Sequence, residues 1–163
     1  MPENQFKFDI QRHRDWQDTA YRGNRRWSGN WGRVWIDNVL IFEIESFEAK
    51  ITNDRDDVII GQSKDSKIVS LTGEGTITIK RVLDSGISAY WESVKAGHDT
   101  RFTIVGAIKD PDMVKGQEQR IQIENVWLNE VDVMHFTKGE VVETEIPFGF
   151  TPEDVRFLST VQS

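Results

Sequence analysis

The sequence predicts a mainly β protein, built either as two packed antiparallel sheets or as a small β-barrel, with one flanking α-helix. Three observations point to this class. Apolar and polar residues alternate along Thr76–Lys80 and Val141–Phe150, a turn at Asp37-Asn38 joins two apolar runs, and a single stretch repeats with helical spacing. About five to seven strands follow from these patterns. Such strands bury one face by pairing sheets or by closing into a barrel.

Length and composition fit one domain without covalent cross-links. The chain has 163 residues, a formal net charge of −7 and no cysteine. A compact domain usually holds about 100–200 residues. The lack of cysteine excludes disulfide frameworks, thiolate metal sites and thiol nucleophiles. No apolar run approaches the roughly 20 residues that cross a bilayer, and no apolar segment follows a basic start. We therefore expect a protein made inside the cell, without a signal peptide or stable membrane association.

Residues 1–31 are expected to form an N-terminal arm rich in tryptophan and arginine. The arm is net positive, whereas the rest of the chain is acidic, which argues against phosphate-backbone binding as the main activity. Gly29 and Gly32 argue against a stable helix in its last part. Trp27 and Trp31 either cover part of the body or anchor a neighbouring subunit, because an arm alone buries so much aromatic area poorly.

The first two strands are predicted around a tight turn. Asp37-Asn38 joins Arg33–Ile36 to Val39–Phe42, a pattern typical of a β-hairpin. The second strand is predicted to continue as far as Ile51. A bulge is expected near Ser46, because the apolar phase shifts there by one residue.

A long polar connection is predicted from residue 53 to residue 70. Compact domains rarely keep a structureless loop of this length without using it. A small apolar patch, Val58-Ile59-Ile60, stands among charged residues and is expected to dock on a partner. The predicted contact residues of this loop are Asp54, Arg55, Asp56, Asp57, Val58, Ile59 and Ile60.

One amphipathic helix is predicted over residues 85–96. Asp84 or Ser85 is suited to cap its start, and Gly97 to end it. Its apolar face is expected to pack on the sheets, through Ile87, Tyr90, Trp91 and Val94. Further strands are expected around residues 102–105, 121–127 and 141–150, followed by a short helical or extended C-terminal segment.

No constellation of side chains in the sequence predicts catalysis or metal binding. The histidines have no partner at ligand spacing, and Asp54–Ile59 lacks the glycine that a calcium loop needs. No helix start follows Gly73-Glu74-Gly75, so its glycines are expected to relieve crowding between strands rather than to bind a dinucleotide. The carboxylate pairs Glu43/Glu45 and Glu143/Glu145 each point to one strand face, which favours solvent-facing rows over a glycosidase acid–base pair. We expect neither enzyme activity nor a cofactor.

Several segments follow one another in a characteristic order along residues 32–158. They are Gly32–Asp37, Ser46–Ala49, Gly73–Thr78, the helix with its exit Lys95–Phe102, and the closing Glu145–Phe150. In this order and spacing the chain resembles the tail tube proteins of contractile phages and of defective prophages of the PBSX type. The resemblance covers a β domain at residues 32–158, leaving the arm at 1–31 and a tail at 159–163.

The resemblance implies a structural subunit that forms hexameric rings stacked into a hollow tube, without a cofactor. The connection at residues 53–70 would reach the adjacent ring. A polar sheet face would line the channel, and its negative charge would let DNA pass transiently and non-specifically without sticking. The candidates for this lining are Glu43, Glu45, Thr76, Thr78, Lys80, Glu143 and Glu145.

The same resemblance implies a set of partners and a location. The partners would be further copies of the chain, the sheath protein, the baseplate, a tape-measure protein and a tail terminator. The subunit would be made in the cytoplasm of a bacterial host and would reside in the tail of a virion or phage-like particle.

Other functions remain open from the sequence. The same fold could form the inner tube of a headless phage-tail-like bacteriocin or of a contractile injection system. A monomeric ligand-binding β-barrel would need an apolar interior with a mouth and no exposed apolar loop. A hydrolase that uses paired glutamates is disfavoured by their placement on single strand faces.

Overall fold

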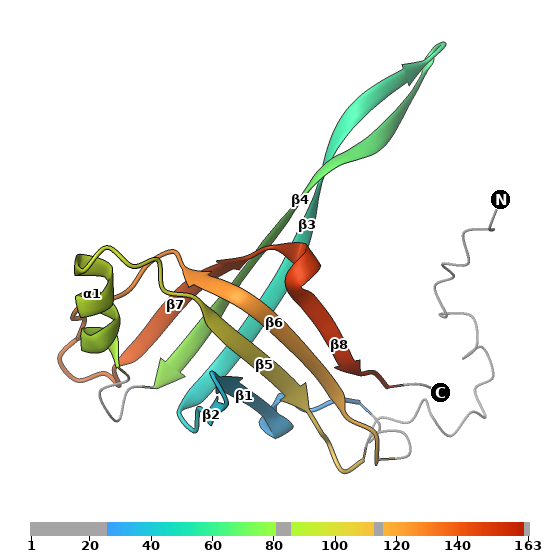
Figure 1. Ribbon diagram of the computed structural model, residues 1–163. Helices are drawn as coiled ribbons and strands as arrows, with labels where there is room; N and C mark the ends of the chain where they lie inside the picture. The colour runs from blue at the N-terminus through green and yellow to red at the C-terminus, as the bar shows by residue number, and fades with distance from the viewer. Residues whose placement is uncertain (1–25, 81–85, 113–115, 162–163) are drawn as a thin grey trace.

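The computed structural model describes residues 26–80, 86–112 and 116–161 (Figure 1). Most of the predicted arm at 1–31, and the helix caps proposed at Asp84 and Ser85, lie outside these ranges. Within them, no helix has the length and apolarity needed to cross a bilayer. The elements are a 3-10 turn (Gly29–Trp31), β1 (Gly32–Ile36), β2 (Val39–Leu40), β3 (Ile44–Ile60), β4 (Ser63–Lys80), α1 (Ile87–Lys95), β5 (Phe102–Ile108), β6 (Gln119–Leu128), β7 (Glu143–Phe150), a second 3-10 turn (Pro152–Asp154) and β8 (Val155–Ser159).

The strands form one antiparallel eight-stranded sheet that folds back on itself at β6. Its order is β2-β1-β5-β6-β7-β4-β3, with β8 also paired to β6. The first part of β6 pairs with β5 and β8, whereas its last residues, Trp127 and Leu128, pair with β7. The two halves therefore face each other around one core, and the described strands do not close into a barrel. Both halves contribute to this core, through Val34, Ile104, Ile123 and Val126 from one and Ile77, Ile79, Phe148 and Phe150 from the other.

The first hairpin is confirmed. Asp37 and Asn38 adopt φ angles of 48° and 66°, the left-handed conformation that a two-residue type I′ turn requires. The prediction that the second strand continues unbroken to Ile51 is wrong. β2 ends at Leu40, and the next three residues carry the chain from one half of the sheet to the other, where β3 begins at Ile44 and pairs with β4.

The predicted bulge and the predicted role of the paired glycines are both confirmed. The register of β3 on β4 shifts between Ile44 and Ser46, which leaves one extra residue on β3. Gly73 and Gly75 lie directly across from Phe150 and Phe148, and a Cβ atom at either glycine would collide with those rings. The glycines thus let two large aromatic rings lie flat on the neighbouring strand.

The predicted polar loop at residues 53–70 is a β-hairpin, so the loop prediction is wrong. β3 and β4 stay paired from the body out to Ile60 and Ser63, with one register shift between Asp54 and Arg55, and Gly61 turns the chain with a φ of 61°. Figure 1 shows these strands projecting far beyond the rest of the molecule. We call residues 53–71 the hairpin arm. Both of its faces are exposed, so its sequence has no reason to alternate apolar and polar residues, and the strand signal is lost.

The helix forms where predicted but is not packed as predicted. α1 ends before Gly97, whose φ of 88° stops the helix, as expected. No residue of α1 is fully buried, and the side chain of Trp91 is 54% exposed. Contact with the body runs through Tyr90, whose ring lies 6.0 Å from that of Phe102, centroid to centroid. The helix therefore covers one end of the sheet rather than filling the core.

Candidate assembly surfaces

A polar face forms on the outer side of β3, β4 and β7. Along β4, Ile77 and Ile79 point into the core, which turns Thr76, Thr78 and Lys80 outward. The strand register then aligns outward-facing neighbours from β3 and β7 on either side of them. The resulting polar face consists of Glu45, Ser46, Glu48, Lys50, Glu74, Thr76, Thr78, Lys80, Glu143 and Glu145.

Carboxylates outnumber lysines on this polar face. The Lys80 ammonium lies 2.8 Å from a Glu45 carboxylate oxygen, and this hydrogen bond raises the pKa of Lys80. Lys50 pairs with Glu74 at 3.4 Å. Both pairs are about half exposed, so they add little to stability, and the surrounding carboxylates leave the face negative.

The structure brings together all but one of the residues predicted to line a channel. The exception is Glu43, which lies in the turn before β3. Its backbone carbonyl accepts a hydrogen bond from the Lys80 amide at 2.9 Å, while its side chain lines a cavity at the end of the sheet. The polar face also includes Ser46, Glu48, Lys50 and Glu74, which were not among the predicted lining residues. The alternation of Glu48 and Lys50 with Phe47 and Ala49 in the sequence could have indicated these two.

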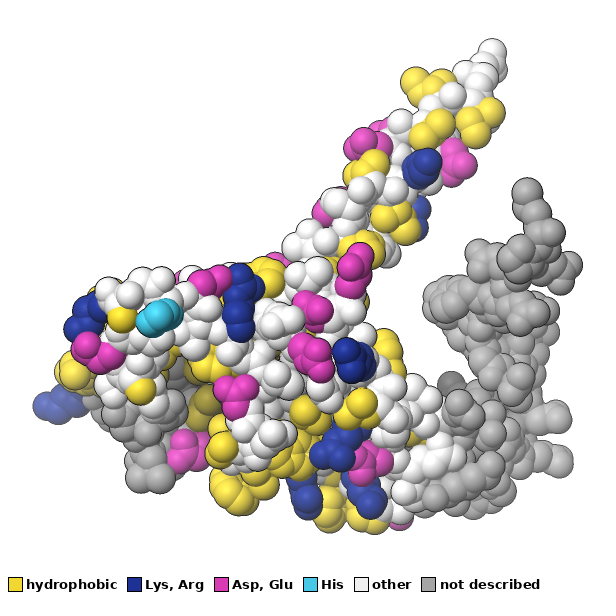
Figure 2. Space-filling view, viewed as in Figure 1, with side chains coloured by type: hydrophobic (Ala, Val, Ile, Leu, Met, Phe, Trp, Pro, Cys, Tyr) yellow, Lys and Arg dark blue, Asp and Glu magenta, His cyan; other side chains and the backbone are white. Residues whose placement is uncertain are grey.

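The predicted contact residues 54–60 all lie on the hairpin arm. Polar contacts between the two strands hold the arm extended: Asp54 accepts hydrogen bonds from the hydroxyls of Ser70 and Thr72, and Lys64 lies 2.7 Å from Asp57. Beyond these contacts, apolar side chains stand exposed along the arm (Figure 2). At its end Ile59 is 80% exposed, with Val58 and Ile60 beside it. The apolar patch expected from the sequence thus lies at the tip of the projecting hairpin arm.

The outer edge of β3 has no partner strand among the described residues. β3 ends the order of the sheet, and it is 17 residues long. An exposed edge of this length offers unpaired N–H and C=O groups to another chain. The polar face borders this edge directly.

Trp27 and Trp31 lie at another part of the molecule. Both are about half exposed, and the chain between them is tied to the body by a hydrogen bond from the Ser28 amide to Asp110 at 3.0 Å. Trp31 lines a shallow hollow beside Trp35, over which the Arg120 guanidinium stacks at 4.9 Å. The exposed half of each indole can contact a neighbouring subunit. Both predicted roles, covering part of the body and anchoring a neighbour, therefore stay open.

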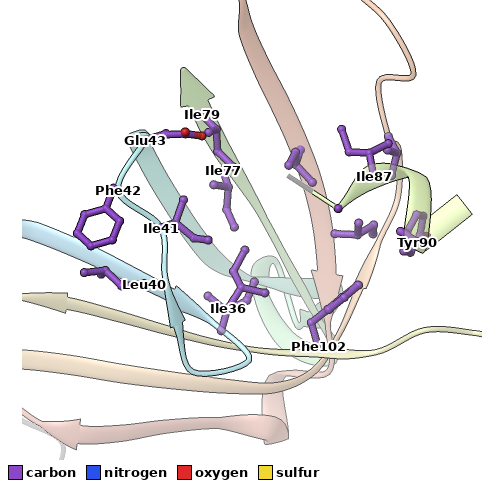
Figure 3. Close-up of a pocket in the computed structure, with 15 residues that line it drawn as sticks. Ile36, Leu40, Ile41, Phe42, Glu43, Ile77, Ile79, Ile87, Tyr90 and Phe102 are labelled. Carbon is purple, nitrogen blue, oxygen red and sulfur yellow. The ribbon is translucent and has the colours of Figure 1, made fainter. Parts of the chain in front are cut away.

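An apolar cavity of about 340 Å³ opens at the end of the sheet that carries α1 (Figure 3). No local sequence pattern predicts it, because its lining comes from separate segments. Ile36 and Ile79 reach it from the sheet, Ile41 from the connection before β3, and Ile87 and Tyr90 from the helix. Among its described lining residues, Glu43 is the charged one.

Comparisons with known proteins agree with one another. A family model described as phage tail tube protein matches residues 19–158. The phage-like element PBSX protein XkdM of Bacillus subtilis (strain 168) is 27% identical over 139 residues, covering 83% of this chain and 94% of that protein.

Two solved structures share the fold at low sequence identity. The sheath–tube complex of an extracellular contractile injection system, PVC, matches with a TM-score of 0.65 at 10% identity, over 83% of this chain and 93% of that one. The sheath/tube terminator of the same system matches with a TM-score of 0.62 at 10% identity, over 78% of this chain and 93% of that one.

Proposed function

Because this chain belongs to the phage tail tube protein family, we propose that its copies close into hexameric rings that stack around a central channel. The observation that carries the proposal is the unpaired edge of β3, bordered by a continuous polar face. A ring in which each β3 edge meets the neighbouring subunit leaves no edge open. Isolated subunits would instead offer these edges to any other chain.

In such rings the polar face of β3, β4 and β7 turns toward the channel. Rotational symmetry repeats its excess of carboxylates around the bore, which gives a lumen of negative potential. A DNA phosphate backbone is repelled by that potential, and the lysines on the face are too few to bind it. DNA therefore passes transiently and non-specifically.

The hairpin arm provides the contact between successive rings. It projects beyond the body and ends in apolar side chains that stand exposed among the described residues. An apolar tip on a projecting hairpin suits a docking element better than a ligand-binding loop.

The role is structural, without catalysis or a cofactor. We place the subunit in the tail of a virion or phage-like particle, made in the cytoplasm of a bacterial host. Its partners are the sheath around the tube, the baseplate and terminator at its ends, and a tape-measure protein inside it during assembly. The sheath–tube complex and the terminator that share its fold support the sheath and the terminator among these partners.

A second candidate is the inner tube of a contractile injection system, supported by the fold shared with the PVC sheath–tube complex. Its tube would carry an effector rather than DNA. Nucleic-acid content of purified particles separates the two roles, because only the phage tail connects to a packaged genome.

Negative-stain microscopy of the concentrated protein tests the proposal. We expect rings and hollow tubes of uniform bore. A protein that stays monomeric at every concentration and salt would contradict it.

Cysteine labelling of assembled tubes tests the lining, since the chain has no cysteine of its own. Glu145→Cys on the polar face should react with a large polyethylene-glycol maleimide in free subunits but be protected in tubes. Glu92→Cys, on the exposed side of α1, is the matched control and should react in both. Equal labelling of both positions in tubes would mean that the polar face lies outside.

A further inference from the structure

The apolar cavity beside α1 has the size and lining of a site for aliphatic side chains. It measures about 340 Å³, and its walls are built from aliphatic and aromatic residues of the sheet and the helix (Figure 3). An engineered apolar cavity of about 150 Å³ holds one benzene molecule, so this one has room for about two side chains of isoleucine size. Phe42 stands at its rim and is 86% exposed.

The hairpin arm carries matching side chains that stand exposed among the described residues. Ile59 and Ile60 are both exposed at its tip, next to the turn at Gly61. The paired strands give the tip a defined shape before it docks, which lowers the conformational entropy that docking costs.

The tip and the cavity lie at opposite ends of the same two strands. The cavity opens where β3 begins, at Ile44, and the tip lies where β3 ends, at Ile60. A strand of 17 residues spans about 55 Å, so the tip of one copy cannot reach its own cavity. Contact between the two surfaces must therefore join different copies head to tail, and a head-to-tail contact whose rotation does not close a ring continues as a filament.

We propose that the cavity beside α1 receives the arm tip, Ile59 and Ile60, of a second copy in the adjacent ring. This rests on the proposed function and names the surface that the arm contacts. Burying these side chains removes the exposed apolar area at the tip and fills the cavity in one step, which is favourable because both apolar surfaces leave water.

One cation at the tip can pair with the charged residue of the cavity. Lys64 lies directly across the hairpin from Ile59, beside the acidic residues Asp57 and Asp65. Glu43 is the charged residue of the described cavity lining. Lys64 and its present partner Asp57 are both well exposed, so exchanging Asp57 for Glu43 sacrifices little energy. The pair would fix the orientation of the tip as it enters.

Cross-linking between two single-cysteine variants tests the contact. Ile59→Cys and Phe42→Cys change exposed side chains in a chain without cysteine. Equal amounts are mixed, assembled into tubes and treated with a short bismaleimide. We expect a cross-linked dimer several-fold stronger than from either variant alone. The control mixture pairs Ile59→Cys with Leu158→Cys on β8, also exposed, and should give little dimer.

The outcomes separate this inference from the proposed function. If the unmodified chain forms neither rings nor tubes, the proposed function fails. If tubes form and Ile59→Cys couples no better to Phe42→Cys than to Leu158→Cys, the proposed contact is wrong and the cavity serves another occupant, such as a small apolar ligand.

A charge placed at the tip gives a second test. Ile59→Asp should leave rings intact but shorten tubes several-fold, because a carboxylate entering the cavity is desolvated without a partner. Val69→Asp, exposed on the shaft of the arm, should leave tube length unchanged. Equal shortening by both variants, or by neither, would overturn the proposal.

Discussion

β3 and β4 run through two environments, and the difference between them explains how this chain is built. In the body, residues 73–80 of β4 alternate between core and surface, and Ile77 is 1% exposed. In the hairpin arm, the same two strands continue with both faces in solvent. The backbone pairing is continuous across the boundary, but the burial is not.

Backbone pairing therefore gives the arm its shape but little stability. A hydrogen bond contributes a net of about 0.5–1.5 kcal/mol, and exposed ion pairs about 0–1 kcal/mol. An isolated two-stranded hairpin is marginal in water. The body is stabilised by its own core, whereas the arm can bury its apolar side chains only against a second surface.

The largest effect on subunit stability is expected in the body. Phe148 is fully buried and stacks at 6.1 Å from Phe47, centroid to centroid. Phe148→Ala should lower the free energy of unfolding by about 3–5 kcal/mol, measured by denaturant titration. Ile59→Ala on the arm is the control and should change it by less than about 0.5 kcal/mol. Similar losses from both would mean that the arm is stabilised by packing as the body is.

A smaller effect is expected from a methyl group placed between two strands of the body. In Gly75→Ala the new Cβ would collide with the Phe148 ring and the Glu48 carbonyl oxygen. Overpacking of this kind should cost about 1–3 kcal/mol. Gly29→Ala, where a Cβ meets no atom within 4 Å, serves as the control and should shift the unfolding midpoint little. An unchanged midpoint for Gly75→Ala would contradict the close approach of Phe148.

The helix should contribute less than its amphipathic sequence suggests. Trp91 is more than half exposed, so Trp91→Ala should lower the free energy of unfolding of the subunit by less than about 1 kcal/mol. Thermal unfolding followed by circular dichroism measures this. A loss as large as that of Phe148→Ala would place Trp91 in the core.

The sequence predicted those parts of the fold in which one face is buried. Alternation located the inner faces of β4 and β7, and the turn residues located the first hairpin, because burial and backbone conformation leave local patterns. The family resemblance, carried by segments of the body, is confirmed by the family match. The hairpin arm left no pattern, because both of its faces are exposed among the described residues.

The polar face, too, was predicted only where a strand alternates between a buried and an exposed face. Six of the ten residues of the polar face were predicted, because alternation within β4 and β7 marks their outward positions. Glu43 was assigned to the face by its spacing from Glu45, but Glu43 lies in the connection before β3, and a two-residue period holds only within one strand. The cavity beside α1 depends on residues brought together from distant segments, which no local pattern reveals.

The smallest effect on subunit stability, and the largest on assembly, is expected from removing the arm. Deletion of Asp54–Lys67 leaves Ile68–Ser70 to connect the residues that already pair, Asn53 and Leu71, so the hairpin closes just outside the body. No core residue is lost, and the thermal unfolding midpoint should stay nearly unchanged. Because the rings would lose their projecting contact, microscopy should show single rings or short stacks in place of tubes. Normal tube yield from this variant would mean that the body alone makes the contact between successive rings. The arm would then not be needed for stacking.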